Sequence, residues 1–272
     1  TRYWRDWSSD VCSSDLPATL VVMRLGGLFL YAPLLSMNAI PARVKGLLVV
    51  LTGVGAWAVL DADNVAFPAV SIMDPWAMVP LGAAEIAIGA LIGFLASLPI
   101  FALQTGGMVM GQQMGLGFAR FYNPAAGTES DVLEQLMVFL AISMFLVMGG
   151  LDALFLSVLR SFHYVQAGVF TGDGAIDLVT GVLLAATELG LRVAVPLLGV
   201  VFLETVAMGF VSKTVPQLNV LSFGFPVRII IGLIMVLAGL EVIMLVSENF
   251  IHDVLDSLYD WAGPGRAIGG GV

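Results

Sequence analysis

Charged residues are scarce in this sequence. Only 11% of its 272 residues are Asp, Glu, Lys or Arg, whereas 59% are hydrophobic. A typical soluble domain carries roughly 25% charged residues, so this composition excludes an ordinary soluble globular protein. The formal net charge of −9 also argues against binding to nucleic acid, whose phosphates attract basic surfaces.

Residues that bind metals or support catalysis are few as well. The chain has one cysteine, Cys12, and two histidines, His163 and His252, which lie far apart in the sequence. A single cysteine cannot form an intrachain disulfide and does not make a thiolate metal site. Neither a Walker A motif nor an HExxH zinc motif occurs. We therefore predict no metal, no cofactor and no enzymatic activity, and an intramembrane enzyme is the weakest alternative.

Long apolar stretches dominate the rest of the chain. A helix that spans a bilayer needs about 20 predominantly apolar residues. The sequence therefore predicts an all-α, polytopic membrane protein with kinked helices and helical hairpins. About six apolar spans are expected, at residues 17–35, 44–60, 78–103, 132–148, 176–210 and 227–246.

The two ends of the chain differ from the apolar middle. Residues 1–16, TRYWRDWSSDVCSSDL, have no apolar core and no small-residue cleavage site, so they are not a normal signal peptide. We interpret them as a non-native leader, with a genuine leader as the alternative. Residues 251–272 begin as an amphipathic helix and end in a glycine-rich tail that we expect to be flexible.

Several charged residues interrupt the apolar stretches: Arg24, Glu85, Glu188, Arg192, Glu204 and Glu241. Such residues usually face protein or water, because a charge at the centre of a membrane helix costs about 2.5–3.5 kcal/mol on insertion scales. Glu188 and Arg192 stand four residues apart in the favourable order and predict a buried ion pair, with a substrate or proton relay as the alternative. Arg24 and Glu85 are expected to pair across helices or to contact another subunit.

The stretch GGMVMGQQMGLGFARFYNPAAG, residues 106–127, combines glycine with glutamine and methionine. Gly107, Gly111 and Gly115 recur every four residues, which places them on one face of a helix. Small residues at this spacing let another helix approach closely. One interpretation of the stretch is therefore ordinary close helix packing inside the protein.

A second interpretation of this stretch is a re-entrant element that faces a pore. Asn123 before Pro124 disfavours helix, and irregular backbone at membrane depth is tolerated only inside protein or along a cavity. The residues that would line or plug such a pore are Met108, Met110, Met114, Phe118, Phe121, Tyr122, Asn123 and Pro124.

A second stretch with turn-forming residues, 211–228, joins the last two long apolar segments. Its expected turn residues are Pro216, Gln217, Asn219, Gly224 and Pro226. A solvent-exposed loop is one interpretation. The Leu, Val and Phe content of the stretch favours the other, in which the turn docks against something.

Three stretches resemble the flagellar biosynthetic protein FliR family, which includes the equivalent component of type III secretion injectisomes. They are RLGGLFLYAPLLSMNAIPARVKGLL (24–48), GQQMGLGFARFYNPAAG (111–127) and VPQLNVLSFGFPVRIIIGL (215–233). With the helices between them, the resemblance covers about residues 17–259. One departure is Asn123, where many relatives have Asp before the proline, so a charge at that position is lost.

The resemblance implies a non-enzymatic core subunit of the export gate, which helps to form and close the export channel across the bacterial inner membrane. It also implies that residues 17–170 are similar to FliP, with 106–127 as a plug-like segment, and that 176–250 are similar to a FliQ hairpin. Expected partners are FliP-like, FliQ-like, FlhB-like and FlhA-like components and secreted unfolded cargo, at the flagellar basal body.

A secondary transporter is the main alternative function. Transporters bind a small solute at broken helices near the middle of the bilayer, and proline-interrupted spans with buried charges are compatible with that. Internal repeats are common in transporters, and this sequence shows no convincing one. The sequence leaves open whether an export subunit would serve a flagellum or an injectisome.

Overall fold

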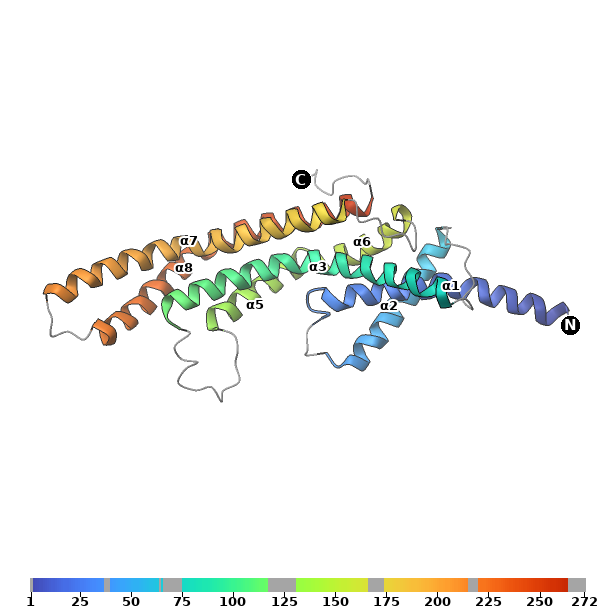
Figure 1. The fold of residues 1–272 in the computed structure, drawn as a ribbon, viewed down its shortest axis with the longest axis horizontal. Helices are drawn as coiled ribbons and strands as arrows, with labels where there is room; N and C mark the ends of the chain where they lie inside the picture. Colours follow the sequence, from blue (N-terminus) through green and yellow to red (C-terminus); the bar gives the residue numbers. More distant parts are fainter. Residues whose placement is uncertain are drawn as a thin grey trace. The chain divides into compact units, whose positions relative to one another are not determined.

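The computed structural model of the chain describes residues 2–36, 40–63, 65, 75–116, 131–165, 174–214 and 220–263. Helices make up nearly all of this described part (Figure 1): α1 (Arg2–Tyr31), α2 (Ala42–Ala62), α3 (Pro75–Met114), α5 (Val132–Val147), α6 (Gly150–Tyr164), α7 (Ala175–Thr214) and α8 (Val220–Ala262). No strand occurs among the described residues. The predicted all-α class is confirmed.

Among the described residues, four helices are long and apolar enough to cross a membrane: Ala42–Ala62, Met78–Met114, Ala175–Thr214 and Phe223–Ala262. A fifth span is possible from α5 and α6 together, which are bent by 61° where they meet. The first expected span is a shorter apolar helix, Pro17–Tyr31, which falls below the roughly 20 residues that a bilayer core requires. The expected number of about six spans is therefore an approximation to the four or five that the structure shows.

The bend between α5 and α6 is set by a glycine. Gly149 has a φ of 72°, a left-handed conformation that glycine adopts without steric cost. The sequence predicted an apolar span over residues 132–148, and α5 ends at Val147, one residue before that bound. α6 then begins at Gly150 as a short amphipathic helix.

The chain divides into two compact units. The first contains Thr1–Ser97, Met148–Gly181 and Asp253–Val272, and the second contains Leu98–Val147 and Val182–His252. α3, α7 and α8 therefore contribute residues to both units. These units do not follow the order of the sequence, and the expected division into parts 17–170 and 176–250, which concerns similarity to other proteins, stays a prediction.

In the first unit, α1 and α3 pack backbone against backbone. A Cβ added to Gly89 of α3 would overlap the carbonyl oxygen of Arg24, and one added to Gly93 would lie 2.7 Å from the carbonyl oxygen of Leu28. Gly27 of α1 would meet the backbone of α3 in the same way. Since lipid tails provide no hydrophobic drive for helices to associate, close contact of this kind is a main source of stability in membranes.

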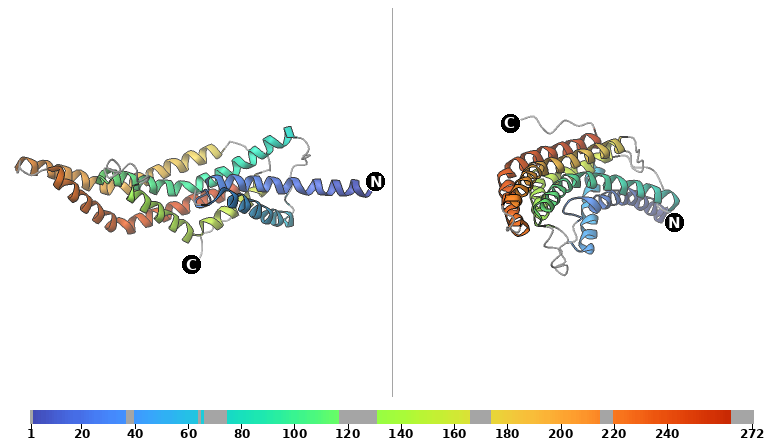
Figure 2. Two further views of the ribbon diagram at one scale, coloured as in Figure 1. Left: turned by 90° about the horizontal axis from the view of Figure 1, so that it is seen from below. Right: turned by 60° about the vertical axis from the view of Figure 1, so that its left-hand side comes forward.

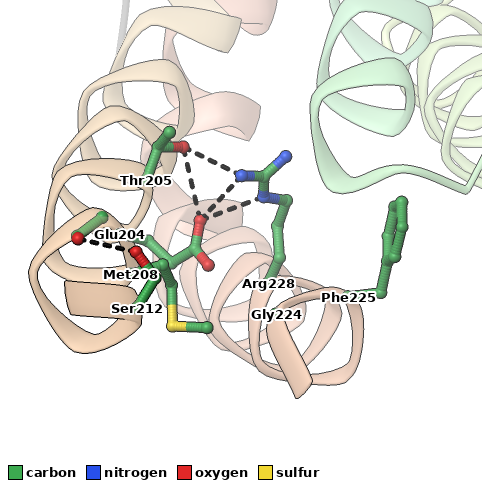
Figure 3. A pocket seen from close by; sticks show the side chains of 8 residues that line it. Glu204, Thr205, Met208, Ser212, Gly224, Phe225 and Arg228 are labelled. Atoms are coloured by element: carbon green, nitrogen blue, oxygen red, sulfur yellow. Dashed lines mark hydrogen bonds and ion pairs between the residues drawn. The ribbon is translucent and has the colours of Figure 1, made fainter. Parts of the chain in front are cut away.

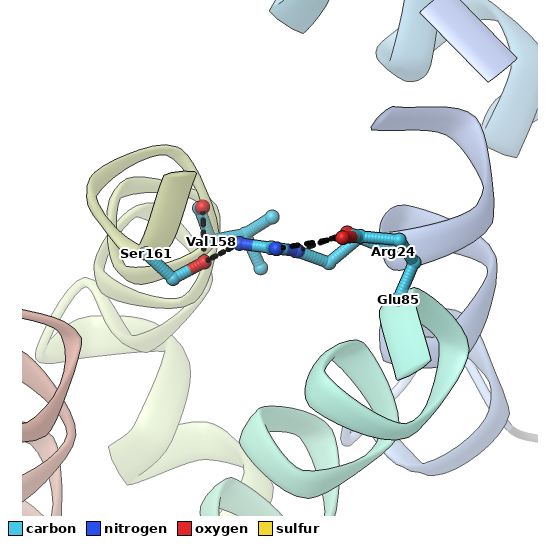
Figure 4. A network of polar contacts seen from close by, with 4 residues as sticks. All are labelled: Arg24, Glu85, Val158 and Ser161. Atoms are coloured by element: carbon cyan, nitrogen blue, oxygen red, sulfur yellow. Dashed lines mark hydrogen bonds and ion pairs between the residues drawn. The ribbon is translucent and has the colours of Figure 1, made fainter. Parts of the chain in front are cut away.

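A buried polar network stands beside this glycine crossing (Figure 4). The Nε atom of Arg24 donates to Oε2 of Glu85 at 2.6 Å, and Nη2 donates to Oε1 at 3.0 Å. Nη1 donates to Oγ of Ser161 in α6 at 2.8 Å. The Cζ atom of Arg24 lies 3.7 Å from the ring centre of Phe162. Both charged residues are 0% exposed. Of the two arrangements that the sequence left open for Arg24 and Glu85, the structure has the pair across helices.

Figure 2 shows the same helices from two further directions. In the second unit, α7 and α8 form a helical hairpin that residues 215–219 connect. Together with the second half of α3 and with α5, this hairpin builds the region in which the candidate site lies.

We predict that breaking the buried ion pair destabilises the protein more than removing it. Arg24→Leu or Glu85→Leu alone should lower the free energy of unfolding by about 3–5 kcal/mol, because each leaves one buried charge unpaired. The double variant should be closer to the native chain. Thermal unfolding in detergent micelles measures the difference. Arg192→Leu is the control, because an exposed pair contributes about 0.5 kcal/mol or less, and equal losses in all variants would contradict the prediction.

We also predict that Gly89→Leu prevents α1 and α3 from packing. The leucine side chain would occupy the space that the α1 backbone fills, so the yield of folded protein and its thermal midpoint should both fall. Gly55→Leu on α2 is the matched control, since a Cβ there meets nothing within 4 Å. Size-exclusion profiles of the two variants provide the comparison. Similar profiles would show that the glycine crossing is dispensable.

Candidate functional site

The candidate site consists of the end of α3, the start of α5 and the α7–α8 hairpin, all in the second unit. Eight of the residues predicted from sequence lie outside the described residues: Phe118, Phe121, Tyr122, Asn123, Pro124, Pro216, Gln217 and Asn219. The others can be placed. Among the described residues, no group of three His, Cys, Asp or Glu side chains could hold a metal ion.

Glycines at the end of α3 let three helices meet. A Cβ on Gly106 would lie 3.0 Å from the carbonyl oxygen of Gly190 in α7. One on Gly107 would lie 2.8 Å from the carbonyl oxygen of Leu133 in α5. Gly111 faces α5 as well, since its Cβ would overlap the carboxylate of Asp131. Gly107 and Gly111 thus lie on the close-packed face that their spacing predicted.

Gly115 is not on that face, which corrects the sequence-based expectation. α3 ends at Met114, and Gly115 follows in a left-handed conformation with φ 81°. Its N–H donates to the carbonyl of Gln112 at 3.1 Å, and the N–H of Leu116 donates to the carbonyl of Gly111 at 3.1 Å. These two bonds make a Schellman motif, so the third glycine of the series terminates the helix and does not extend the packing face.

The start of α5 is held by a reciprocal cap. Asp131 precedes the first helical residue, and its N–H donates to Oε2 of Glu134 at 3.2 Å, as in a capping box. Nε2 of Gln104 in α3 donates to Oε1 of Glu134 at 2.8 Å. Asp131 is buried, and its Oδ2 atom has no hydrogen-bond partner within the part of the chain that the structure describes. The end of α3 and the start of α5, which flank residues 117–130, are therefore in direct contact with each other.

The three methionines of the predicted plug have different surroundings. Met108 is 38% exposed, whereas Met110 and Met114 are each 1% exposed. Met114 packs against α8, where a Cβ on Gly232 would lie 2.6 Å from its Cγ. In the isolated chain, only Met108 of the three presents a surface, and it shares that surface with the exposed Gln112.

The hairpin turn is shorter than the sequence predicted. α7 ends at Thr214 and α8 begins at Val220, so Gly224 and Pro226 lie inside α8 and not in the turn. Pro226 is the seventh residue of α8 and has no backbone N–H, so the carbonyl four residues earlier receives no helical hydrogen bond from it. Gly224 makes room for Met208 of α7, whose Cε atom would lie 3.5 Å from an added Cβ.

A polar contact between the hairpin helices was not predicted from sequence (Figure 3). Glu204 of α7 accepts from Nε of Arg228 of α8 at 3.0 Å, and Nη2 of Arg228 donates to Oγ1 of Thr205 at 2.9 Å. Glu204 is 8% exposed, and no described residue forms a hydrogen bond with its Oε1 atom. The three side chains border a cavity of about 340 Å³. The signal was available, because the two charges lie at similar distances on either side of the turn.

The ion pair of Glu188 and Arg192 forms, but it is exposed, whereas the sequence predicted that it is buried. Nη2 of Arg192 and Oε1 of Glu188 are 2.5 Å apart, and the two side chains are 65% and 67% exposed. Spacing along one helix ensures that the two groups can meet, whereas burial depends on which face of α7 the other helices cover. Glu241 of α8 is exposed as well.

Comparison with known proteins places this arrangement in a family. The model of the bacterial export proteins, family 1, matches residues 16–254. The flagellar biosynthetic protein FliR of Escherichia coli K12 is 30% identical, over 88% of this chain and 90% of its own. FliR of Bacillus subtilis 168 is 26% identical over 88% and 92% of the two chains. The surface presentation of antigens protein SpaR of Salmonella typhimurium is 25% identical over 78% of each.

The resemblance stated from the sequence is therefore confirmed, and the multiple apolar helices agree with a multi-pass membrane protein. A family match over most of the chain leaves the solute-transporter alternative without support. This chain belongs to the bacterial export proteins, family 1, and is a component of a flagellar or type III export apparatus.

Proposed function

We propose that this chain is a non-enzymatic core subunit of the export gate in the inner membrane, and that residues 106–127 help to close its channel. One observation carries the proposal: both ends of residues 117–130 are fixed against each other. Gly115 terminates α3 in a Schellman motif, Asp131 and Glu134 cap α5, and Asp131 lies against Gly111. A segment anchored at two touching points on rigid helices is suited to obstructing a channel without pulling the helices apart.

The outer surface of the α7–α8 hairpin supports a role inside a larger assembly. Large apolar side chains such as Phe202, Phe210 and Leu237 are exposed on it. The exposed Glu188–Arg192 pair lies on α7 too. An ion pair that faced lipid would be costly, whereas apolar side chains mixed with a few charges are typical of protein interfaces. FliP-like and FliQ-like subunits are the partners we propose, with FlhB-like and FlhA-like components and unfolded cargo.

The hairpin also supports the proposed similarity of residues 176–250 to a FliQ subunit. It consists of two long helices joined by a short connection and tied by the Glu204–Arg228 pair. In this proposal, residues 17–170 form the FliP-like part. The higher identity to the Escherichia coli FliR, 30% compared with 25% for SpaR, favours a flagellar basal body over an injectisome.

The proposal predicts that the chain assembles with its partners. Coexpression with the FliP-like and FliQ-like proteins of the same genome should give a stable particle that contains one copy of this chain and several copies of each partner. Native mass spectrometry of the detergent-purified particle, isolated through a tag on this chain, measures the composition. A monomer or homodimer, recovered while the partners are well expressed, would refute the gate assignment.

The plug assignment makes a separate prediction about conductance. Deleting residues 118–124 should make cells that carry the assembled complex permeable to ions, because the obstruction would be gone while the helices remain capped. Replacing the same residues with an equal number of Gly and Ser residues keeps the length and tests the side chains alone. Membrane conductance is the measurement, with assembly checked in parallel. Unchanged conductance in an assembled deletion variant would exclude the plug role.

A further inference from the structure

A second cavity, of about 400 Å³, lies within the second unit between α3, α7 and α8. Its walls include Met110 of α3, Val193 and Leu197 of α7, and Met235 and Ile243 of α8. Ten of its eleven lining residues are apolar, and Arg192 is the exception. A polar ligand would lose its hydrogen bonds to water there without replacement, so the ligand that suits these walls is a hydrocarbon chain.

Two residues, Gly239 and Pro196, shape the walls of this cavity. Gly239 of α8 has no side chain, and a Cβ placed on it would meet nothing within 4 Å. Pro196 of α7 lacks a backbone N–H, so the carbonyl of Arg192, four residues earlier, has no helical donor from that residue. One side of the cavity is therefore open because Gly239 has no side chain. The wall near Arg192 contains a backbone carbonyl that receives no helical hydrogen bond from Pro196.

The cavity has a charged end and an apolar body. Arg192 lines it, and among the described residues its ion-pair partner is Glu188, at the exposed surface of α7. An exposed pair of this type contributes about 0.3–0.5 kcal/mol, so another anion can compete with the Glu188 carboxylate for the guanidinium. Phosphate, like carboxylate, binds arginine through bidentate, charge-assisted hydrogen bonds. The charged end is therefore complementary to a phosphate group.

The length of the apolar body is that of a lipid tail. Along α8 the lining residues extend from Met235 to Val246, which corresponds to about 16 Å at 1.5 Å per residue. We propose that the cavity binds one acyl chain of an anionic phospholipid, with the phosphate held at Arg192. The phosphate would replace the Glu188 carboxylate at the guanidinium, and the acyl chain would fill the space that Gly239 leaves empty.

Lipid retention by the full-length chain tests this proposal directly. Dioleoyl phosphatidylglycerol is added to the detergent-purified protein, and native mass spectrometry counts the bound lipid. Gly239→Leu should weaken binding of the first lipid about tenfold or more, because the leucine carbons replace methylenes of the acyl chain. Gly199→Leu is the matched control, since Gly199 also has open space and does not line the cavity. Equal retention in the two variants would overturn the proposal.

Two substitutions at the charged end should act in opposite directions. Glu188→Gln frees the guanidinium and should increase binding of phosphatidylglycerol, whereas Arg192→Gln should reduce it about fivefold. Binding of dioleoyl phosphatidylcholine should change less in both cases. These changes are small and lie on an exposed surface, so they test the site without threatening the fold. Identical responses of the two lipids would place the phosphate elsewhere and overturn the assignment of Arg192.

A partner subunit is the competing occupant, and the coexpressed complex distinguishes it. A photoreactive fatty acyl phospholipid should label the lining of the cavity in the assembled particle, and Gly239→Leu should abolish that label. Cross-links from the Gly239→Cys variant to another subunit, with no lipid label, would show that a protein side chain fills the cavity and would refute the lipid. Particle formation is measured separately, so this outcome leaves the gate assignment intact.

Discussion

The close approach of α3 to its neighbours is the constraint on which the rest of the structure depends. In a membrane, apolar helices gain little from leaving lipid, and they associate mainly through packing and polar contacts. On α3, glycines allow close packing and thereby bring polar side chains of neighbouring helices within hydrogen-bond distance. Gly89 and Gly93 bring the α1 backbone so near that Arg24 and Glu85 can form two short hydrogen bonds out of contact with lipid. Further along the helix, Gly106 and Gly107 do the same for α7 and α5.

This constraint explains why the charges near α3 are tolerated. A lone arginine in an apolar helix costs free energy on insertion, and a buried pair recovers that cost only when its geometry is good and its remaining donors are satisfied. Ser161 takes one donor of Arg24, and the Phe162 ring covers its guanidinium. The network therefore connects three helices, α1, α3 and α6, and fixes their register at one level of the first unit.

The sequence predicted the class of fold, the family and the packing face of Gly107 and Gly111, because these depend on composition, motif order and helical periodicity. The same four-residue spacing was present at Glu85, Gly89 and Gly93, and it was not used. Other features depend on information that periodicity does not contain. Whether Gly115 continues a helix or ends it is decided by two backbone hydrogen bonds. Whether the Glu188–Arg192 pair is buried is decided by which face of α7 its neighbours cover.

The caps on either side of residues 117–130 are formed by residues outside that segment. Gly115 closes α3 with its own backbone, and Asp131, Glu134 and Gln104 hold α5 with side chains that lie outside the segment. Among the described residues, the hydrogen bonds that cap these two helix ends therefore all come from outside residues 117–130. Substitutions in this segment leave these caps in place, so the helix ends can be preserved in relatives whose segments differ in sequence.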